Sequence, residues 1–287
     1  IQSLLCNAGS LIGYLFPIFF TWIGISNSAP KGVIPQSVIW SFYAGAAILI
    51  LCVLYTFLKV KEYSPEEYAQ YNGTTENNSH VSFVRLLRDA PQTFWAVGLV
   101  QFFCWAAFLF MWTYTNGAVA DSCWHTTDVS SAAYQEAGNW VGVLFAVQAV
   151  GSIIWALVIP RFHSLKRAYV VSLLIGAAGF VGTLLMHNQW LLLPCYLLIG
   201  VAWAAMLALP FTLLTNSLSG EHMGEYLGLF NGTICLPQIV AAATGGVLLK
   251  ALGGSQEAML VAAGVLLAIG AAMVTLVKEK KQSTIDN

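Results

Sequence analysis

Charged residues are scarce in this sequence. Asp, Glu, Lys and Arg make up 9% of the 287 residues, whereas hydrophobic residues make up 58%. A soluble domain carries about 25% charged residues, so this chain has too little charge to cover a surface that faces water. The composition therefore predicts a membrane protein. The few Lys and Arg residues fall in short clusters between apolar runs, which excludes the continuous basic surface that nucleic-acid-binding domains use.

The patterns of metal sites and disulfide frameworks are also lacking. None of the six cysteines belongs to a CxxC pair or a Cys/His cluster, so we expect no metal, no cofactor and no disulfide framework. Five cysteines lie in apolar runs, where cysteine behaves as a small hydrophobic residue, and Cys123 is expected to lie in a polar loop. The sequence also lacks an HExxH motif and an intramembrane carboxylate pair, which argues against a membrane-embedded enzyme.

Long apolar runs dominate what is present. A bilayer core of about 30 Å needs about 20 apolar residues in a helix. Eight runs have this length: 3–24, 38–59, 92–115, 139–160, 169–187, 189–213, 226–249 and 256–277. None of them has Asp, Glu, Lys or Arg near its middle. The expected fold class is an all-α polytopic membrane protein, with a tight turn at 187–189 between the fifth and sixth runs.

The basic residues indicate the orientation. If the segment after the second run faces the cytoplasm, ten of the twelve Lys and Arg residues are cytoplasmic, namely Lys59, Lys61, Arg85, Arg88, Arg161, Lys166, Arg167, Lys278, Lys280 and Lys281. The positive-inside rule favours this orientation. We therefore expect an integral protein of the plasma (cytoplasmic) membrane with both chain ends in the cytoplasm.

The polar segment 61–90 has two apolar runs before it and six after it. We interpret it as a cytoplasmic linker that can contain a short surface helix before Pro91. Its Asn-X-Ser/Thr patterns at Asn72 and Asn77 are taken as chance, because their predicted side is cytoplasmic. If the linker joins halves of equal size, four helices are missing from the front. The expected domains are the last two helices of an N-terminal bundle (1–60), the linker (61–90), a C-terminal six-helix bundle (91–277) and a cytoplasmic tail (278–287).

Four stretches resemble a known family. GEYLGLFNGTICLPQI (224–239) is similar to the eleventh span of the sugar:cation symporters of the major facilitator superfamily, in the glycoside–pentoside–hexuronide branch that contains the sucrose:proton symporters. There, a G-x-Y-x-G-x-x-N start is followed by PQ. QFFCWAAFLFMWTYTNGAVA (101–120) and GVAWAAMLALPFTLL (200–214) resemble the seventh and tenth spans of that branch. PRFHSLKRAY (160–169) lies where the superfamily has a basic loop.

The resemblance implies a twelve-helix fold, of which eight helices are present. It also implies a secondary transporter in which two six-helix bundles alternate access to a central site. The family's membrane-embedded acidic and arginine residues for proton coupling lie mainly in the four absent spans. We therefore expect this part of the chain to supply substrate contacts, and not to transport without the missing N-terminal helices.

The 224–239 stretch combines helix packing with polar groups. Gly224, Gly228 and Gly232 form a small-xxx-small ridge on which another helix can pack closely. Pro237 removes one backbone hydrogen bond and is expected to kink the helix. Such broken backbone is tolerated at membrane depth only beside protein or a water-filled cavity.

Two amides of this stretch are candidate substrate ligands. Asn231 and Gln238 are seven residues apart and lie on nearly one face, displaced from the glycine ridge. An amide that faces lipid is costly. This face is therefore expected to line a substrate cavity or, alternatively, to bond neighbouring helices.

The run 92–115 carries a second polar and aromatic stripe. Gln101, Trp105, Phe108, Trp112 and Thr115 follow each other at steps of three or four residues. Aromatic rings stack on the C–H surfaces of sugars while an amide bonds hydroxyl groups. Gln101, Trp105 and Trp112 are therefore candidates for substrate binding. The alternatives are interhelical packing and, for Trp112, the interfacial aromatic belt.

The remaining candidates have a weaker signal. The further substrate-binding candidates are Asn116, Asn139, Trp140 and Trp203. Asn116 and Asn139 can instead cap their spans, and Trp140 can belong to the aromatic belt. A gating salt bridge is possible between Glu225 and the basic loop residues Arg161, Lys166 and Arg167.

The expected function is secondary active transport, by proton-coupled symport of a sucrose- or maltose-like disaccharide. The expected partners are the sugar, a coupling cation taken to be a proton, and the lipid bilayer. The alternatives are an uncoupled sugar facilitator, a drug exporter of the same superfamily, a non-transporting sensor or scaffold and, more distantly, a membrane-embedded enzyme. A drug exporter should expose a mainly apolar cavity, so the Gln, Asn and Trp faces favour a sugar.

Overall fold

The computed structural model describes residues 2–27, 29–30, 33–72, 82–218 and 223–278. Every regular element in these ranges is a helix, and eight of the helices are long and apolar enough to cross a membrane. The prediction of an all-helical membrane protein with eight spans is confirmed. The chain divides into two compact units, residues 1–15, 30–32 and 90–287, and residues 16–29 and 33–89.

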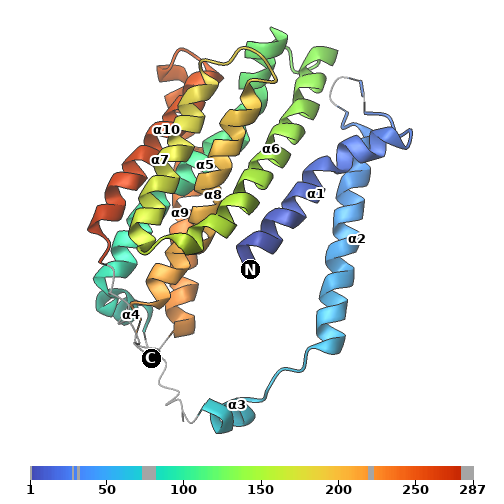
Figure 1. The fold of residues 1–287 in the computed structure, drawn as a ribbon. Helices are drawn as coiled ribbons and strands as arrows, with labels where there is room; N and C mark the ends of the chain where they lie inside the picture. The colour runs from blue at the N-terminus through green and yellow to red at the C-terminus, as the bar shows by residue number, and fades with distance from the viewer. Residues whose placement is uncertain (1, 28, 31–32, 73–81, 219–222, 279–287) are drawn as a thin grey trace. The chain divides into compact units, whose positions relative to one another are not determined.

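The first unit contains six long helices, which run side by side in Figure 1. They are α5 (Gln92–Trp124), α6 (Ala132–Val158), α7 (Leu165–Thr183), α8 (Leu192–Thr215), α9 (Met223–Ala251) and α10 (Gln256–Met273). The short 3-10 helices η1 (Ile159–Arg161) and η2 (Val274–Leu276) follow α6 and α10. Each long helix matches one of the six apolar runs after the polar segment.

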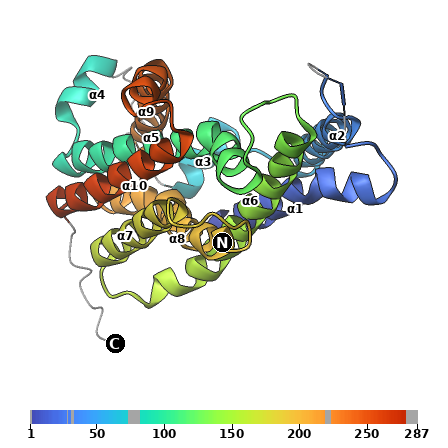
Figure 2. The same ribbon diagram turned by 90° about the horizontal axis from the view of Figure 1, so that it is seen from above.

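The packing order of this bundle is simple. Helix α8 packs between α6 and α7, and α10 packs between α5 and α7, as the view from above in Figure 2 shows. Helix α5 also contacts α6 and α9, so it has the most neighbours. Helix α9 packs mainly on α5 and buries a narrow stripe, Tyr226, Phe230, Pro237, Ala241 and Gly245.

Glycines set the close crossing of α6 and α8. A Cβ atom at Gly200 of α8 would collide with the carbonyl oxygen of Gln148 in α6, and a Cβ at Gly151 of α6 would collide with the carbonyl oxygen of Leu197. Ser152 Oγ donates a hydrogen bond of 2.8 Å to the Gly200 carbonyl across the same crossing. Small residues permit such backbone contacts between membrane helices, so this crossing depends on glycine on both sides.

Glycines have the same role between α7 and α8. A Cβ at Gly176 would collide with the Cβ of Ala202, and a Cβ at Gly179 would lie 2.7 Å from the carbonyl oxygen of Cys195. Helix α8 is therefore held at close range on two sides.

Two helix ends differ from the predicted runs by the largest amount. Helix α5 continues to Trp124 instead of ending at residue 115, because the segment after Asn116 is rich in alanine and Ala118–Ala120 are buried in the bundle. Helix α6 begins at Ala132 instead of residue 139, because Ser131 Oγ caps it by accepting a 3.1 Å hydrogen bond from the Tyr134 amide. Asn116 and Asn139 thus lie inside helices, and the capping alternative is wrong for both.

The predicted turn between the fifth and sixth runs is confirmed. Helix α7 ends at Thr183 and α8 begins at Leu192, so the connection spans residues 184–191 and is longer than the turn expected at 187–189. The Asn188 side-chain oxygen accepts a 2.9 Å hydrogen bond from the Trp190 amide, which stabilises this reversal.

The second unit contains the end of α1 (Gln2–Trp22), α2 (Gln36–Lys59), α3 (Pro65–Asn72) and α4 (Phe83–Asp89). Helix α4 is the short helix expected before Pro91, and α3 is an additional one. Asn77, Lys280 and Lys281, which entered the sequence predictions, lie outside the described residues.

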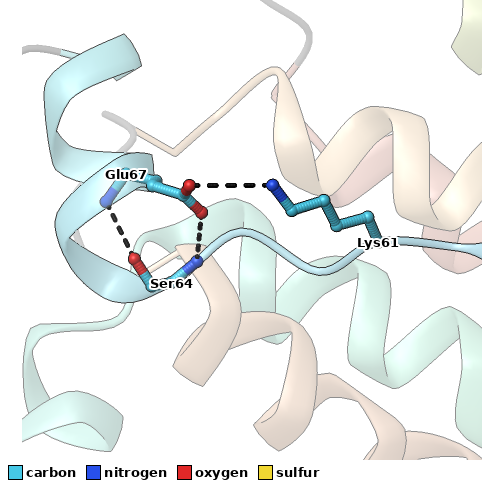
Figure 3. Close-up of polar contacts among 3 residues, drawn as sticks. All are labelled: Lys61, Ser64 and Glu67. Atoms are coloured by element: carbon cyan, nitrogen blue, oxygen red, sulfur yellow. Dashed lines mark hydrogen bonds and ion pairs between the residues drawn. The ribbon is translucent and has the colours of Figure 1, made fainter.

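A reciprocal capping box starts α3, as Figure 3 shows. Ser64 Oγ accepts a 3.2 Å hydrogen bond from the Glu67 amide, and Glu67 Oε2 accepts a 3.1 Å hydrogen bond from the Ser64 amide. The Lys61 ammonium lies 3.8 Å from the other carboxylate oxygen, Oε1. Two amide groups that a helix start leaves unpaired are thereby satisfied.

Replacing Ser64 with alanine is expected to weaken α3 by about 1 kcal/mol, because the Glu67 amide loses its acceptor. Faster amide hydrogen exchange across 65–72 would show this. Lys61→Ala is the control: it removes only an exposed ion pair, which is worth about 0.2–1 kcal/mol. Equal exchange in Ser64→Ala and the unmodified protein would contradict the capping role.

Candidate functional site

An aromatic cluster joins α5 and α8. The ring centroid of Trp203 in α8 lies 5.7 Å from that of Trp105, 4.9 Å from Phe108 and 5.6 Å from Trp112 of α5. We call these four residues the tryptophan cluster. Trp105 is 9% exposed and Trp112 is 37% exposed, so the cluster is buried at one end and open at the other. The structure thus brings Trp203, which was predicted separately, against Trp105 and Trp112 of the predicted α5 stripe.

The ring N–H of Trp105 lacks the hydrogen bond that other tryptophans of the bundle make. The Nε1 atoms of Trp124, Trp140 and Trp155 donate to the Glu136 carboxylate at 3.2 Å, the Gln189 carbonyl at 3.1 Å and Ser172 Oγ at 2.7 Å, respectively. The Nε1 of Trp105 is buried and has no hydrogen-bond partner among the described residues.

Two further polar atoms of the bundle share this property. Asn116 Oδ1 of α5 and Gln148 Oε1 of α6 are buried without a partner in the described part of the chain. An unmade hydrogen bond on a buried group costs about 1–3 kcal/mol, and water that could make it is scarce at membrane depth. One donor, Trp105 Nε1, and two acceptors are therefore without partners among the described residues of the bundle.

The other members of the predicted α5 stripe bond neighbouring helices. Gln101 is 1% exposed, and its Oε1 accepts a 3.3 Å hydrogen bond from the hydroxyl of Tyr169 in α7. Thr115 is fully buried, and its Oγ1 accepts a 3.0 Å hydrogen bond from the hydroxyl of Tyr196 in α8. In this structure Gln101 therefore has the interhelical contact that the sequence left as its alternative role.

Trp140 lies at the end of the bundle that carries the α7–α8 turn. Besides donating to the Gln189 carbonyl, its ring packs 4.8 Å from that of Trp190. Both contacts hold the turn against α6. Asn139 precedes Trp140 in α6 and is half-buried. These contacts favour a structural or belt role for Trp140.

The candidates on α9 have few contacts within the first unit. Asn231 is exposed, Gln238 is half-buried and Pro237 is buried. Helix α9 continues through Pro237, and one turn earlier Thr233 Oγ1 donates a 2.6 Å hydrogen bond to the Phe230 carbonyl. The cavity-lining role of Asn231 and Gln238 stays a prediction.

The glycine ridge of α9 faces open space in the described structure. A Cβ at Gly224, Gly228 or Gly232 would meet no atom within 4 Å, so the predicted close packing on this ridge stays a prediction. Helices α5 and α9 approach closely elsewhere. A Cβ at Gly98 would lie 3.0 Å from Thr233 Cγ2, and one at Gly245 would lie 2.8 Å from the Tyr114 hydroxyl oxygen.

An apolar groove of about 570 Å³ lies between α5, α9 and α10. Its walls include Phe102 and Phe110, which lie on a different face of α5 from the tryptophan cluster. Thr244 is the polar residue in the lining, and its hydroxyl donates to the Val240 carbonyl at 2.8 Å. The groove therefore offers a ligand only apolar contact.

Comparison with protein families decides the identity of the fold. A family model described as Major Facilitator Superfamily matches residues 122–286, which is more than half of the chain. The chain belongs to the major facilitator superfamily. The protein is therefore an integral membrane transporter of this superfamily, with a small molecule as its substrate. No curated protein matches the chain.

The basic segment 160–169 connects α6 and α7. Arg161 Nη1 donates to the Leu157 carbonyl at 3.2 Å, and Lys166 Nζ donates to the Thr275 carbonyl in η2 at 3.1 Å. A cation near the C-terminal end of a helix is favourable, because the unpaired carbonyls there carry partial negative charge. The Arg167 amide bonds Ser164 Oγ, which caps α7. The gating salt bridge of this loop to Glu225 stays a prediction.

Gln148 is not among the site residues that the sequence predicted. A signal was present, because Gln148 is an amide near the middle of the apolar run 139–160. A polar side chain at that depth is a functional candidate by default.

Proposed function

We propose that this superfamily member is a sugar transporter and that the tryptophan cluster forms part of its substrate wall. The observation that carries the proposal is the buried, unpaired Nε1 of Trp105 within an aromatic cluster that opens at Trp112. Sugars have C–H faces that stack on aromatic rings, and hydroxyl groups that both donate and accept hydrogen bonds. A disaccharide matches the donor of Trp105 and the acceptor of Asn116.

The domain assignment is part of this proposal. We assign α5–α10 to the C-terminal bundle and α1 and α2 to the N-terminal bundle, with the linker 61–90 and the tail 278–287 in the cytoplasm of a plasma membrane protein. The bundles would rock about a central site to expose it to one side at a time. The basic α6–α7 loop supports this orientation by the positive-inside rule.

Proton coupling is the second part of the proposal, and it rests on the resemblance to sugar:cation symporters. The acidic residues of α5–α10 lie near helix ends, namely Asp121, Glu136, Glu225 and Glu257. Coupling needs an ion-binding group whose charge state biases the alternating-access equilibrium. We therefore assign substrate contacts to this bundle and proton binding to the N-terminal bundle.

A drug exporter is the second candidate, and the apolar groove between α5, α9 and α10 is the observation that favours it. The acyl chains of the bilayer also fit a groove that offers only apolar contact. The unpaired polar atoms near the tryptophan cluster have no such explanation in lipid, so we place the sugar first.

The complete gene product in proteoliposomes tests the function. Uptake of labelled sucrose and maltose would be measured with and without an inward proton gradient. Accumulation driven by the gradient and abolished by an uncoupler is the expected result. Equilibration without accumulation would replace the symporter with a facilitator. Extrusion of a lipophilic dye with no sugar uptake would replace the sugar with an amphiphilic drug.

A further inference from the structure

The amide of Gln148 lies deep in the bundle and its oxygen is unpaired. The residue is in the middle part of α6 and is 3% exposed. Its Oε1 has no hydrogen-bond partner among the described residues. Native proteins pair the large majority of their buried polar side-chain atoms, so this atom needs an explanation.

Contacts with α8 place Gln148 beside the segment that carries Trp203. The carbonyl oxygen of Gln148 lies against Gly200, one helical turn before Trp203. One turn before Gln148, the ring of Phe145 lies 6.1 Å from that of Tyr196. Residues 196–200 of α8 therefore pack against α6 around Gln148, and Trp203, one turn further on, packs against Trp105 of α5.

The structure of α6 does not use the Gln148 side chain. The polar groups of α6 that connect helices next to Gln148 are one and two turns further on. Ser152 Oγ donates to the carbonyls of Gln148 at 3.1 Å and Gly200 at 2.8 Å, and Trp155 Nε1 donates to Ser172. A leucine at position 148 would have a similar size without an unpaired amide, so packing alone favours an apolar residue there.

We propose that Gln148 is a specificity-determining residue whose amide oxygen accepts a hydrogen bond from one hydroxyl group of the transported sugar. This inference rests on the proposed function and adds a substrate contact on α6 to the aromatic wall on α5 and α8. A buried acceptor discriminates strongly against an analogue that lacks the matching hydroxyl, because the acceptor is then left unpaired.

The test combines Gln148→Leu with monodeoxy analogues of the transported disaccharide, each lacking one hydroxyl, in proteoliposomes that contain the complete gene product. We expect the unmodified protein to show a KM about tenfold higher for one of these analogues, since one hydrogen bond is worth up to about a tenfold change. Gln148→Leu should raise the KM for the parent sugar by a similar factor. It should show no additional loss with that one analogue.

Two readouts separate this role from a structural one. Gln148→Leu should unfold at the same or a higher temperature than the unmodified protein, because no bond is lost and a buried unpaired group is removed. Ser152→Ala is the matched α6 control. It loses the bond to the Gly200 carbonyl, so it should lower the unfolding temperature and leave the KM of every analogue unchanged.

The outcomes of this test distinguish an error in the proposed function from an error in the assignment of Gln148. If the unmodified protein moves no sugar, the proposed function is wrong and the assignment of Gln148 falls with it. If the unmodified protein transports sugar and Gln148→Leu has the same KM, only the assignment of Gln148 is wrong. Loss of folding in Gln148→Leu, or a further loss with every analogue, would also overturn it.

Discussion

Replacing Gly200 with alanine is expected to destabilise the protein severely. The new methyl group would collide with the carbonyl oxygen of Gln148, and a helix backbone cannot turn aside as a flexible side chain can. Helices α6 and α8 would have to separate, which stretches the 2.8 Å bond from Ser152 to the Gly200 carbonyl. Overpacking a core costs about 1–3 kcal/mol, and we expect a loss at the upper end of this range, about 3 kcal/mol, in the free energy of unfolding measured on the purified protein.

Gly246→Ala is the matched control for this substitution. It places the same methyl group in a membrane helix, α9, where a Cβ would meet no atom within 4 Å. Because alanine favours helix over glycine, this variant should be neutral or more stable by up to about 1 kcal/mol. Equal stability of Gly200→Ala and the unmodified protein would contradict the close α6–α8 crossing.

Trp105→Phe is expected to raise the KM for the transported sugar about five- to tenfold, because the phenylalanine ring lacks the unpaired N–H that we assign to the substrate. The aromatic contacts of the position with Trp112 and Trp203 are largely kept. The unfolding temperature should fall only by the effect of the smaller ring, since no hydrogen bond of the folded protein is lost. Transport kinetics and thermal unfolding, measured on the same preparations, check both parts.

Trp155→Phe makes the same chemical change where the N–H has a partner. Trp155 Nε1 donates a hydrogen bond to Ser172 Oγ at 2.7 Å. The loss of this bond should lower the free energy of unfolding by about 1 kcal/mol beyond the effect of the smaller ring. The KM should stay unchanged. An unchanged KM in Trp105→Phe, or equal KM increases in the two variants, would remove the tryptophan cluster from the substrate wall.

The helices could be predicted from the sequence because length and apolar composition determine which segments cross a bilayer. The errors are at helix ends. Hydropathy places an end where polar residues begin, whereas α5 continues past Asn116 because Ala118–Ala120 are buried. Helix α6 begins early because Ser131 caps it. A cap and a buried continuation are local features that an average over a window of residues removes.

The candidate site could be predicted only in part. Helical spacing placed Trp105 and Trp112 on one face of α5, but it could not show that Trp203 of α8 lies against both of them. Such a meeting depends on the packing of distant segments. The same stripe also contains Gln101, which the structure pairs with Tyr169, and spacing alone does not distinguish a wall residue from an interhelical contact.

Glycine spacing also could not show which glycines contact another helix. The regular ridge at Gly224, Gly228 and Gly232 meets no atom within 4 Å in the described residues, whereas the irregularly placed Gly151 and Gly200 lie against the backbone of the facing helix. A small-xxx-small pattern shows where a close approach is possible. The partner helix decides where one occurs.

Equilibrium binding of a radiolabelled disaccharide to the purified, complete gene product tests directly whether the tryptophan cluster binds sugar. We expect saturable binding that unlabelled sugar displaces. Trp105→Phe and Gln148→Leu should weaken this binding, and Trp155→Phe should leave it unchanged. Absence of saturable binding to a correctly folded protein, or equal affinity in all three variants, would contradict the account.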